Sequence, residues 1–373
     1  MSKGLALITG GGGFIGSHTA DELLGAGYRV RLFDNLTSSG RADGARWPDW
    51  LAADAERVSG DVRSRDDWRK ALRGVDAVIH LAAHQDLLPD FAQFFHVNSV
   101  GTALLYELIV ADRLPVKKVV VASSQFVYGE GRYHCATDGE VFPGGRDPGR
   151  LATGQWEPAC PRCEGAIAPL PLLETHANPR NPYAISKYSQ ELMAIALGRN
   201  YGVPSVALRC SIVQGPRQSF RNAYSGVLRI FAQQMLTGRP ASVFEDGRQL
   251  RDFVNVEDVA RANRLVLERE EANFEVFNVG GGRGDTVWDF AQIVAETVGH
   301  GAIDVTGEYR VGDTRHSVSD IAKLRRLGWG PMKTTRDSVR DYIAWIGQQQ
   351  LDKDYAGEAL ETLRRVGTLR KAT

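Results

Sequence analysis

The chain has 373 residues, of which 43% are hydrophobic and 24% charged, and its 45 basic residues balance 45 acidic ones. This length predicts two or three globular units at about 150 residues each, and the zero net charge argues against a nucleic acid or an acidic membrane as the main partner. No run approaches the ~20 apolar residues of a membrane span, and the sequence after Met1 does not resemble a signal peptide. Four cysteines are too few for the disulfide framework of a secreted protein. We therefore expect a soluble, cytoplasmic protein.

The first 129 residues alternate short apolar runs with longer amphipathic segments. The predicted strands lie at 5–8, 29–33, 77–80 and 119–122, and helical patterns lie between them, for example at 13–26 and 98–112. Strands that alternate with helices indicate a parallel sheet with right-handed crossovers. The sequence therefore predicts a Rossmann-type, doubly wound α/β domain.

The amino-acid composition changes between residues 130 and 177. Gly and Pro are dense there, three of the four cysteines lie there, and no periodicity is visible, so this segment is either a functional insertion or disordered. Asn181 and Pro182 then form an N-cap and a favoured first helical residue. We expect a helix to about Asn200, followed by a strand at 205–208.

A glycine-rich turn joins the first strand to the first helix. It reads G-x-x-G-x-x-G, with Gly10, Gly13 and Gly16 as its glycines. Such glycines let backbone N–H groups approach a pyrophosphate at the positive end of a helix. Asp34 ends the second strand, where a carboxylate binds a ribose 2′-hydroxyl and disfavours a 2′-phosphate. The pattern predicts a dinucleotide site that prefers NAD to NADP.

Tyr183 and Lys187 form a Tyr-x-x-x-Lys pair. On a helix these positions share one face, so the ammonium lies near the phenol. A phenol has an ordinary pKa near ~10, but a neighbouring ammonium and an oxidised nicotinamide both favour the phenolate. Ser123 and Ser124 directly follow the predicted strand at 119–122, at the sheet edge where ligands bind. A serine there can hydrogen-bond a reacting hydroxyl.

Taken together, these motifs resemble the extended short-chain dehydrogenase/reductase family and, more narrowly, its nucleotide-sugar epimerases and dehydratases. The resemblance also rests on Gly60-Asp61-Val62, His80-Leu81-Ala82-Ala83, Asn98, Val127-Tyr128-Gly129 and Arg251-Asp252-Phe253-Val254. The run 309–316 and Tyr-Gly-Glu-Gly at 128–131 are similar to dTDP-L-rhamnose (6-deoxyhexose) 4-epimerases.

The resemblance implies a role for each matched residue. Tyr183 is the general base, Lys187 its electrostatic partner, and Ser124, four residues before the Tyr of Val-Tyr-Gly, the hydroxyl-binding donor. Arg217 and Arg251 hold the diphosphate of a sugar nucleotide. The implied cofactor contacts are Gly10, Gly13, Phe14, Ile15, Gly16, Asp34, Asn35, Asp61, Val62, Leu81, Ala82, Ala83, Asn98, Tyr183 and Lys187.

The expected reaction is 4-epimerisation through a 4-keto sugar, with NAD regenerated in every cycle. Dehydratases need acid and base residues just after the catalytic Ser or Thr, whereas Gln125 and Phe126 stand there. Net oxidoreduction and decarboxylation of a glucuronate stay open as alternatives. The intact Ser124, Tyr183 and Lys187 argue against a dinucleotide-binding protein without turnover.

The sequence departs from the family pattern at two places. Ile212 stands where the family has an Asn that donates to the substrate diphosphate. The segment after Ala83 lacks the expected glycines and serine; we expect His84, Gln85 and Asp86 to face the sugar, and the alternative is a solvated loop. The family resemblance also implies a homodimer that pairs through the helix of Tyr183 and its neighbour at 98–112.

The cysteine-containing insertion suggests a zinc site. Cys160 and Cys163 form a C-x-x-C knuckle, and Cys135 with Asp138 forms a second one. Such a set suits a tetrahedral structural Zn²⁺, and His134 or His176 are alternatives to Asp138 as the fourth ligand. Free thiols in a degenerate site and a disulfide remain competing interpretations.

We divide the chain accordingly. The expected units are an NAD-binding domain at 1–210 with the insertion at 130–177, a nucleotide-sugar domain mainly at 211–345 with some segments returning to the first domain, and a helical tail at 346–373.

Overall fold

The computed structural model describes residues 3–37, 46–85, 88–221, 226–351 and 353–373. Its centre is a seven-stranded sheet made of β1 (Leu5–Thr9), β2 (Arg29–Asp34), β3 (Glu56–Ser59), β4 (Ala77–His80), β5 (Lys118–Ser124), β9 (Ser205–Cys210) and β14 (Val276–Val279). The strand order is β14-β9-β5-β4-β1-β2-β3, and every neighbouring pair is parallel. The predicted Rossmann-type doubly wound sheet is confirmed.

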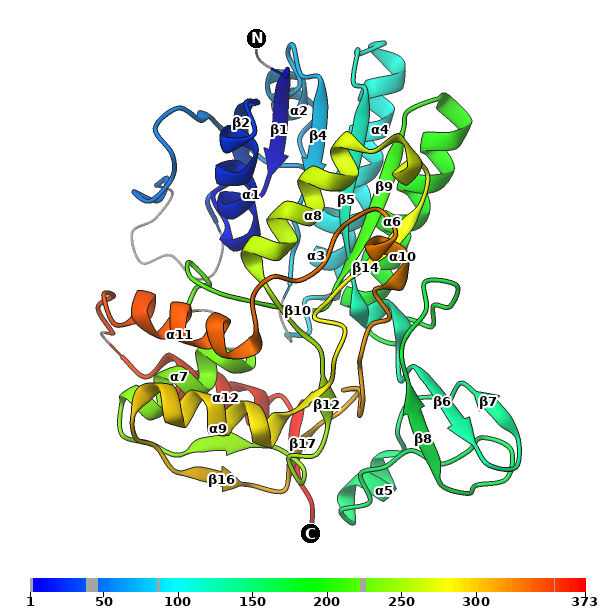
Figure 1. Cartoon of the computed structure of the whole chain (residues 1–373), viewed down its shortest axis with the longest axis vertical. Helices are drawn as coiled ribbons and strands as arrows, with labels where there is room; N and C mark the ends of the chain where they lie inside the picture. Colours follow the sequence, from blue (N-terminus) through cyan, green and yellow to red (C-terminus); the bar gives the residue numbers. More distant parts are fainter. Residues whose placement is uncertain (1–2, 38–45, 86–87, 222–225, 352) are drawn as a thin grey trace.

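Helices cover both faces of this sheet (Figure 1). One face carries α1 (Phe14–Gly25) and α8 (Val256–Glu268), and the other carries α2 (Arg65–Ala71), α4 (Gly101–Ala111) and α6 (Pro182–Tyr201). Strand β1 shows why both layers form. Its side chains alternate between two buried clusters, with Ala6 and Ile8 facing α1 and α8, and Leu5 and Leu7 facing the other three helices.

The helix that contains Asn98 begins earlier than the sequence predicted. α3 (Phe91–Phe94), a π-helical turn η1 (Phe95–Val100) and α4 form one continuous run. By length and composition, the run 91–111 is the one helix of the described residues that could cross a membrane, and the sequence analysis missed it. In the fold it covers the sheet instead, because Leu105 and Leu108 lie in the core and Asn98 is buried.

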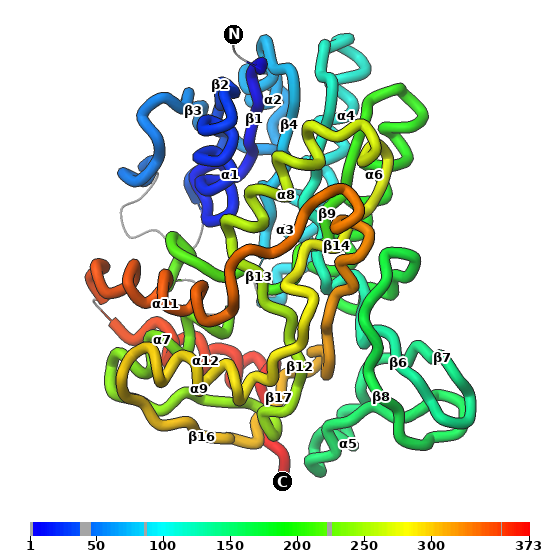
Figure 2. The backbone as a smooth tube through the Cα atoms, in the orientation of Figure 1, coloured from blue at the N-terminus to red at the C-terminus, as the bar shows by residue number. Residues whose placement is uncertain are grey.

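A smaller unit lies below the carboxyl edge of the sheet. It contains α7 (Val227–Leu236), α9 (Val287–Val298), α11 (Thr335–Ile346), and the strand pairs β10 (Ile212–Gln214) with β13 (Phe253–Asn255), β11 (Ala241–Val243) with β16 (Ile303–Val305), and β12 (Leu250–Arg251) with β15 (Asp285–Thr286). Phe231, Phe290 and Tyr342 belong to its core. Figure 2 shows that the chain crosses repeatedly between the units, since α8, β14 and α10 (Ala322–Arg325) return to the sheet.

The C-terminal segment packs onto this smaller unit. α12 (Tyr355–Arg365) buries Leu360 and Leu363 on one face, and β18 (Leu369–Lys371) pairs antiparallel with β17 (Glu308–Arg310). α12 lies within the segment 346–373 for which we expected a helical tail.

The cysteine-containing insertion folds as a three-stranded antiparallel sheet beside the main body (Figure 1). Its strands are β6 (Arg132–Cys135), β7 (Gly139–Val141) and β8 (Ile167–Leu170), in the order β7-β6-β8, and α5 (Pro148–Ala152) lies in the connection. Of the two alternatives left by the sequence, disorder does not describe this segment.

Candidate active site

A cavity of about 1500 Å³ lies between the carboxyl edge of the sheet and the smaller unit. Ligands of open α/β sheets bind at this edge. Pockets for a single small ligand measure about 300–1000 Å³. The cavity is therefore large enough for a dinucleotide together with a second molecule.

The glycine-rich turn forms one end of the cavity. Gly10 adopts a φ of +66°, and a Cβ on Gly16 would lie 2.2 Å from the carbonyl oxygen of Gly10. Gly13 caps α1 without a side-chain hydrogen bond, and no acidic residue lies in the first turn. The helix N-terminus is thus uncovered toward the cavity and suits a pyrophosphate. Phe14 and Ile15 line the same end.

Asp34 and Asn35 follow the turn along the cavity wall. Asp34 accepts hydrogen bonds from the backbone N–H groups of Gly12 at 3.0 Å and Leu36 at 2.8 Å. Its place at the end of β2 fits a ribose contact, and together with the turn it shows that the chain's own residues fit NAD.

Asp61 and Val62 form a neighbouring part of this region. Val62 lines the cavity, whereas Asp61 lies behind it and forms an ion pair with Arg63 at 2.7 Å. Hydrogen bonds from Arg63 lower the pKa of Asp61 to about 2. Arg63 itself lines the cavity, and the sequence analysis missed it.

Leu81, Ala82 and Ala83 line the cavity just after β4. The hydroxyl of Thr9 accepts from the N–H groups of Leu81 at 3.1 Å and Ala82 at 3.0 Å. Asn98 does not line the cavity. Its amide oxygen accepts a hydrogen bond from the backbone N–H of His84, and its amide nitrogen donates to the carbonyl oxygen of His84 and to the hydroxyl of Ser186. Asn98 thus connects the loop after β4 to helix α6.

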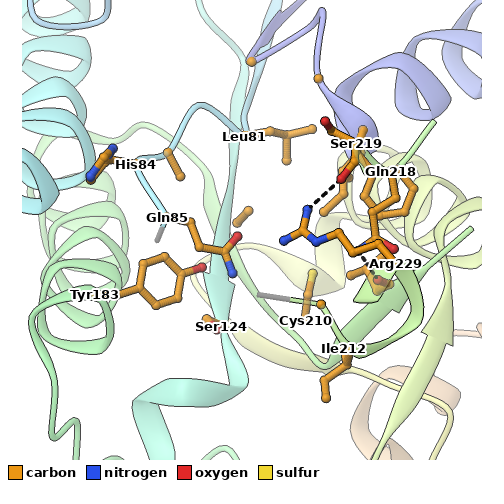
Figure 3. A pocket seen from close by; sticks show the side chains of 18 of the residues that line it. Leu81, His84, Gln85, Ser124, Tyr183, Cys210, Ile212, Gln218, Ser219 and Arg229 are labelled. Carbon is orange, nitrogen blue, oxygen red and sulfur yellow. Dashed lines mark hydrogen bonds between the residues drawn. The ribbon is translucent and has the colours of Figure 1, made fainter. Parts of the chain in front are cut away.

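Tyr183 and Ser124 project into the middle of the cavity (Figure 3). The Tyr183 ring packs between Phe94 and Phe126, with ring centroids 6.3 and 5.9 Å away. Asn181 caps α6 through the N–H of Ala184, which fixes the start of the helix that carries Tyr183. Lys187 lies one turn further along and lines the cavity with only 1% of its surface exposed.

Burial controls the ionisation of this pair. It raises the pKa of Tyr183 to about 12, and the hydrogen bond with Ser124 opposes that shift. Burial also lowers the pKa of Lys187 to about 8. In the chain alone the phenol is therefore protonated at neutral pH. A cationic nicotinamide ring beside it would move its pKa down again.

A chain of buried hydrogen bonds holds Lys187 in place. Its ammonium donates to the amide oxygen of Gln190, and the Gln190 amide donates to Thr102 at 2.9 Å. The ring of His80 lies 3.1 Å from the same Thr102 hydroxyl, and burial lowers the pKa of His80 to about 3, so the imidazole is neutral. The sequence analysis identified none of these three as supporting residues.

The two adjacent serines have different partners. Ser123 donates to Glu191 at 2.7 Å, while the Ser124 hydroxyl accepts from the N–H of Phe126 at 3.3 Å. The next residue, Gln125, accepts a hydrogen bond from Ser317 at 2.9 Å. Ser124 is thus the serine whose hydroxyl can donate a hydrogen bond to a ligand.

Several arginines also line the cavity. Arg217 forms an ion pair of 2.7 Å with Asp21 of α1. Arg251 donates to the carbonyl oxygens of Thr314 at 2.8 Å and Arg315 at 2.9 Å, so its side chain is fixed before any ligand arrives.

Two further arginines there were missed by the sequence analysis. Arg229 is buried, donates to the carbonyl oxygen of Ser219 at 3.1 Å and points into the cavity (Figure 3). Arg310 lies 3.6 Å from Asp313 and also lines the wall. Arg310 lies in the run 309–316, which is similar to the corresponding run of the 6-deoxyhexose 4-epimerases, and that similarity could have identified it.

The segment after Ala83 reaches the cavity at both of its described residues. Gln85 lines the cavity and its amide points toward Tyr183 in Figure 3. His84 also lines the cavity, and its ring is held by Asp90 at 2.9 Å and packs on Phe94. Asp86 lies outside the described residues.

Two residues at the ends of strands complete the wall. Ile212 and Cys210 both line the cavity (Figure 3), and burial raises the pKa of the Cys210 thiol to about 12. Ile212 presents no donor to a phosphate.

The cysteine-containing insertion contributes a separate cluster. The structure brings Cys135, Asp138, Cys160 and Cys163 together, with one ligand atom of each within 4.8 Å of all the others. His134 and His176 do not join this group.

A parallel sheet with a dinucleotide turn at one end of its cavity and a Ser-Tyr-Lys set at the centre defines the class: a short-chain dehydrogenase/reductase of the extended type. Residues 6–144 and 164–280 match the sequence model described as "NAD dependent epimerase/dehydratase family", and the chain belongs to this family.

Known relatives agree with this assignment. The chain is 32% identical over 350 residues to the dTDP-L-rhamnose 4-epimerase of Burkholderia thailandensis, a match that covers 92% of this chain and 95% of the relative. UDP-glucose 4-epimerase of Thermotoga maritima, solved with UDP-glucose, matches with a TM-score of 0.72 and 30% identity over 92% of this chain and 99% of that one. UDP-glucose 4-epimerase of Thermus thermophilus, solved with NAD, gives a TM-score of 0.72 and 28% identity over 93% of this chain and 100% of that one.

Proposed function

We propose that the protein is an NAD-dependent 4-epimerase of a nucleotide sugar. The observation that carries this proposal is a single cavity lined by Ser124, Tyr183 and Lys187, by the dinucleotide turn and by several arginines. Relatives named as 4-epimerases, of dTDP-L-rhamnose and of UDP-glucose, support it.

Each residue of the set has a defined task in this reaction. NAD⁺, when bound, supplies the acceptor for the hydrogen that leaves sugar C4. Ser124 donates a hydrogen bond to the sugar O4, and the Tyr183 phenolate takes the O4 proton. Lys187 stabilises that phenolate through its positive charge. After the 4-keto sugar has turned its other face to the nicotinamide, Tyr183 returns the proton to O4.

The residues after Ser124 favour epimerisation over dehydration. Elimination of water across C5 and C6 needs an acid and a base beside C5. Gln125 is a neutral amide engaged by Ser317, and Phe126 packs on Tyr183. Neither side chain can exchange a proton with the sugar.

The arginines support a diphosphate in the substrate. We assign Arg251 and Arg310 to the diphosphate oxygens, with Arg229 and Arg217 adding positive charge to the cavity wall. Ile212, which cannot donate to a phosphate, increases the dependence on these guanidinium groups. The resemblance to 6-deoxyhexose epimerases makes dTDP-6-deoxyhexoses the first substrates to test.

Incubation with a panel of dTDP-, UDP- and GDP-hexoses, with products identified by NMR, tests the proposal. We expect a mixture of the two C4 epimers of one sugar nucleotide and no net formation of NADH. Stoichiometric NADH would instead identify an oxidoreductase. A pentose product from UDP-glucuronate would identify a decarboxylase, and either result would overturn the epimerase assignment.

We further expect a homodimer that forms through α6 and the helical run 91–111. These two helices pack side by side, and Val100, Ile185 and Leu192 are exposed on them. Exposed apolar residues gathered on two adjacent helices are typical of an interface between subunits. Leu192→Glu should place a charge in that interface and shift the protein from dimer to monomer, as measured by light scattering during size-exclusion chromatography.

The matched control for this prediction is Met332→Glu. Met332 is 77% exposed, against 51% for Leu192, but lies on neither helix, so its substitution should leave the mass unchanged. A wild-type protein that is monomeric, or a Leu192→Glu variant that stays dimeric, would contradict this dimer.

A further inference from the structure

We propose that the insertion holds a structural zinc ion, bound by Cys135, Asp138, Cys160 and Cys163. Three of the six separations among the ligand atoms are close to those of a zinc site. The Asp138 Oδ2 atom lies 3.6 Å from the Cys135 sulfur and 3.2 Å from the Cys160 sulfur, and the sulfurs of Cys135 and Cys163 are 3.5 Å apart. A tetrahedral ion with Zn–S bonds of about 2.3 Å and a Zn–O bond of about 2.0 Å places its ligand atoms roughly 3.5–3.8 Å from one another.

The same separations argue against a disulfide. A disulfide bond joins two sulfurs at about 2.05 Å, and all four cysteines of the chain are unpaired. Three thiols and a carboxylate that converge on one point form a closed set of four ligands. That composition favours Zn²⁺ over Mg²⁺ or Ca²⁺, which prefer oxygen ligands throughout.

The backbone of the insertion brings the two halves of the set together. Cys135 ends β6, and Asp138 lies in the turn that leads to β7. Cys160 and Cys163 lie in a turn closed by hydrogen bonds of 2.9 Å between Glu164 N–H and Cys160 C=O and between Cys160 N–H and Gly165 C=O. Because β6 pairs with both β7 and β8, the two turns meet at the same end of this small sheet.

The insertion has only a small apolar core of its own. Its buried apolar cluster consists of Tyr133, Val141 and two of the ligands, Cys135 and Cys160, with Ile167 packed against it. A unit of this size is generally held by metal ions or disulfides. Metal binding that orders the ligands contributes its free energy directly to folding.

The ion is structural rather than catalytic. None of its four ligands lines the large cavity, and the four protein ligands leave no coordination position for a substrate.

The site still has an indirect route to the cavity, because ion pairs join the insertion to the main body of the protein. Arg146 of the insertion lies 2.8 Å from Glu245, and Glu157 of the insertion lies 2.7 Å from Arg315. The carbonyl of Arg315 accepts from Arg251 at 2.9 Å. Loss of zinc should therefore raise the KM for substrate as well as lower the melting temperature.

Metal analysis of the untagged, full-length protein tests the site. We expect about one zinc per chain, visible d–d bands of tetrahedral geometry after replacement by Co²⁺, and a lower melting temperature after removal by a chelator. Zinc near zero in protein purified without chelator, or mass spectrometry that shows a disulfide among these cysteines, would overturn the proposal.

Three variants make the assignment specific. Cys163→Ser removes the most exposed ligand and should abolish stoichiometric zinc, while Asp138→Cys completes a four-thiolate set and should retain it against higher chelator concentrations. His134→Ala, one residue from Cys135 and exposed, should leave the zinc content unchanged. Equal zinc in Cys163→Ser and in the wild type would contradict this ligand set. If Cys163→Ser does not fold, the wild-type stoichiometry and the Asp138→Cys variant still decide the question.

Discussion

Tyr183→Phe should lower kcat by about 10²–10⁴-fold, because it removes the one group placed to exchange a proton with the sugar hydroxyl. The substitution deletes a single oxygen, and the ring keeps its contacts with Phe94 and Phe126. Binding of NAD and of the sugar nucleotide should therefore change little. Steady-state kinetics measures the loss of turnover, and the cofactor content of the purified variant measures retention of NAD.

Tyr201→Phe is the matched control for this variant. Tyr201 ends the same helix α6, but it is 58% exposed and lies away from the cavity. Its turnover should equal that of the wild type. Full activity of Tyr183→Phe would show that the proton travels by another route.

Lys187→Met should have the second-largest effect, with a loss of roughly 10²-fold in kcat and an altered pH profile. A nearby positive charge favours the phenolate and so lowers the pKa of Tyr183; removing the charge raises that pKa. The acidic limb of the profile of kcat/KM against pH should accordingly move to higher pH.

The alkaline limb should change as well. Burial lowers the pKa of Lys187 to about 8, so the wild-type ammonium loses its proton, and its support for the phenolate, as the pH rises through that value. The variant has no such group, and its alkaline limb near pH 8 should disappear. Lys187→Arg keeps a permanent charge and should keep the acidic limb near the wild-type position. A Lys187→Met profile that matches the wild type would contradict the electrostatic role.

The sequence predicted the parts of the fold that have local signals. β1 and β5 are apolar on both faces, and α6 begins at an Asn-Pro cap. Both features can be recognised from a few consecutive residues of the sequence. Edge strand β3 reads Glu-Arg-Val-Ser and carries no apolar pattern, because one of its sides meets solvent. The strands of the insertion could not be predicted either, because three short strands with so few buried residues show no alternation of apolar and polar residues.

The candidate site divides in a similar way. The glycine turn, Asp34, and the pair Tyr183 and Lys187 are sequence motifs, and the structure brings them to one cavity. Arg229 reaches that cavity only because α7 packs on α9 and β11 in the smaller unit, and the spacing of residues along the sequence does not reveal such long-range contacts. Asn98 was expected to touch the cofactor, whereas its amide is engaged by His84 and Ser186.

The most direct test of the central claim follows a deuterium atom at C4 of the sugar. The enzyme, with its NAD, would convert a 4-deuterated sugar nucleotide in ordinary water, and NMR would read the isotope at C4 of the epimer. Transfer to NAD and back predicts that the product keeps its deuterium at C4, with no hydrogen taken from solvent. Replacement of that deuterium by solvent hydrogen would show that C4 is not inverted by transient oxidation, and would contradict the proposed mechanism.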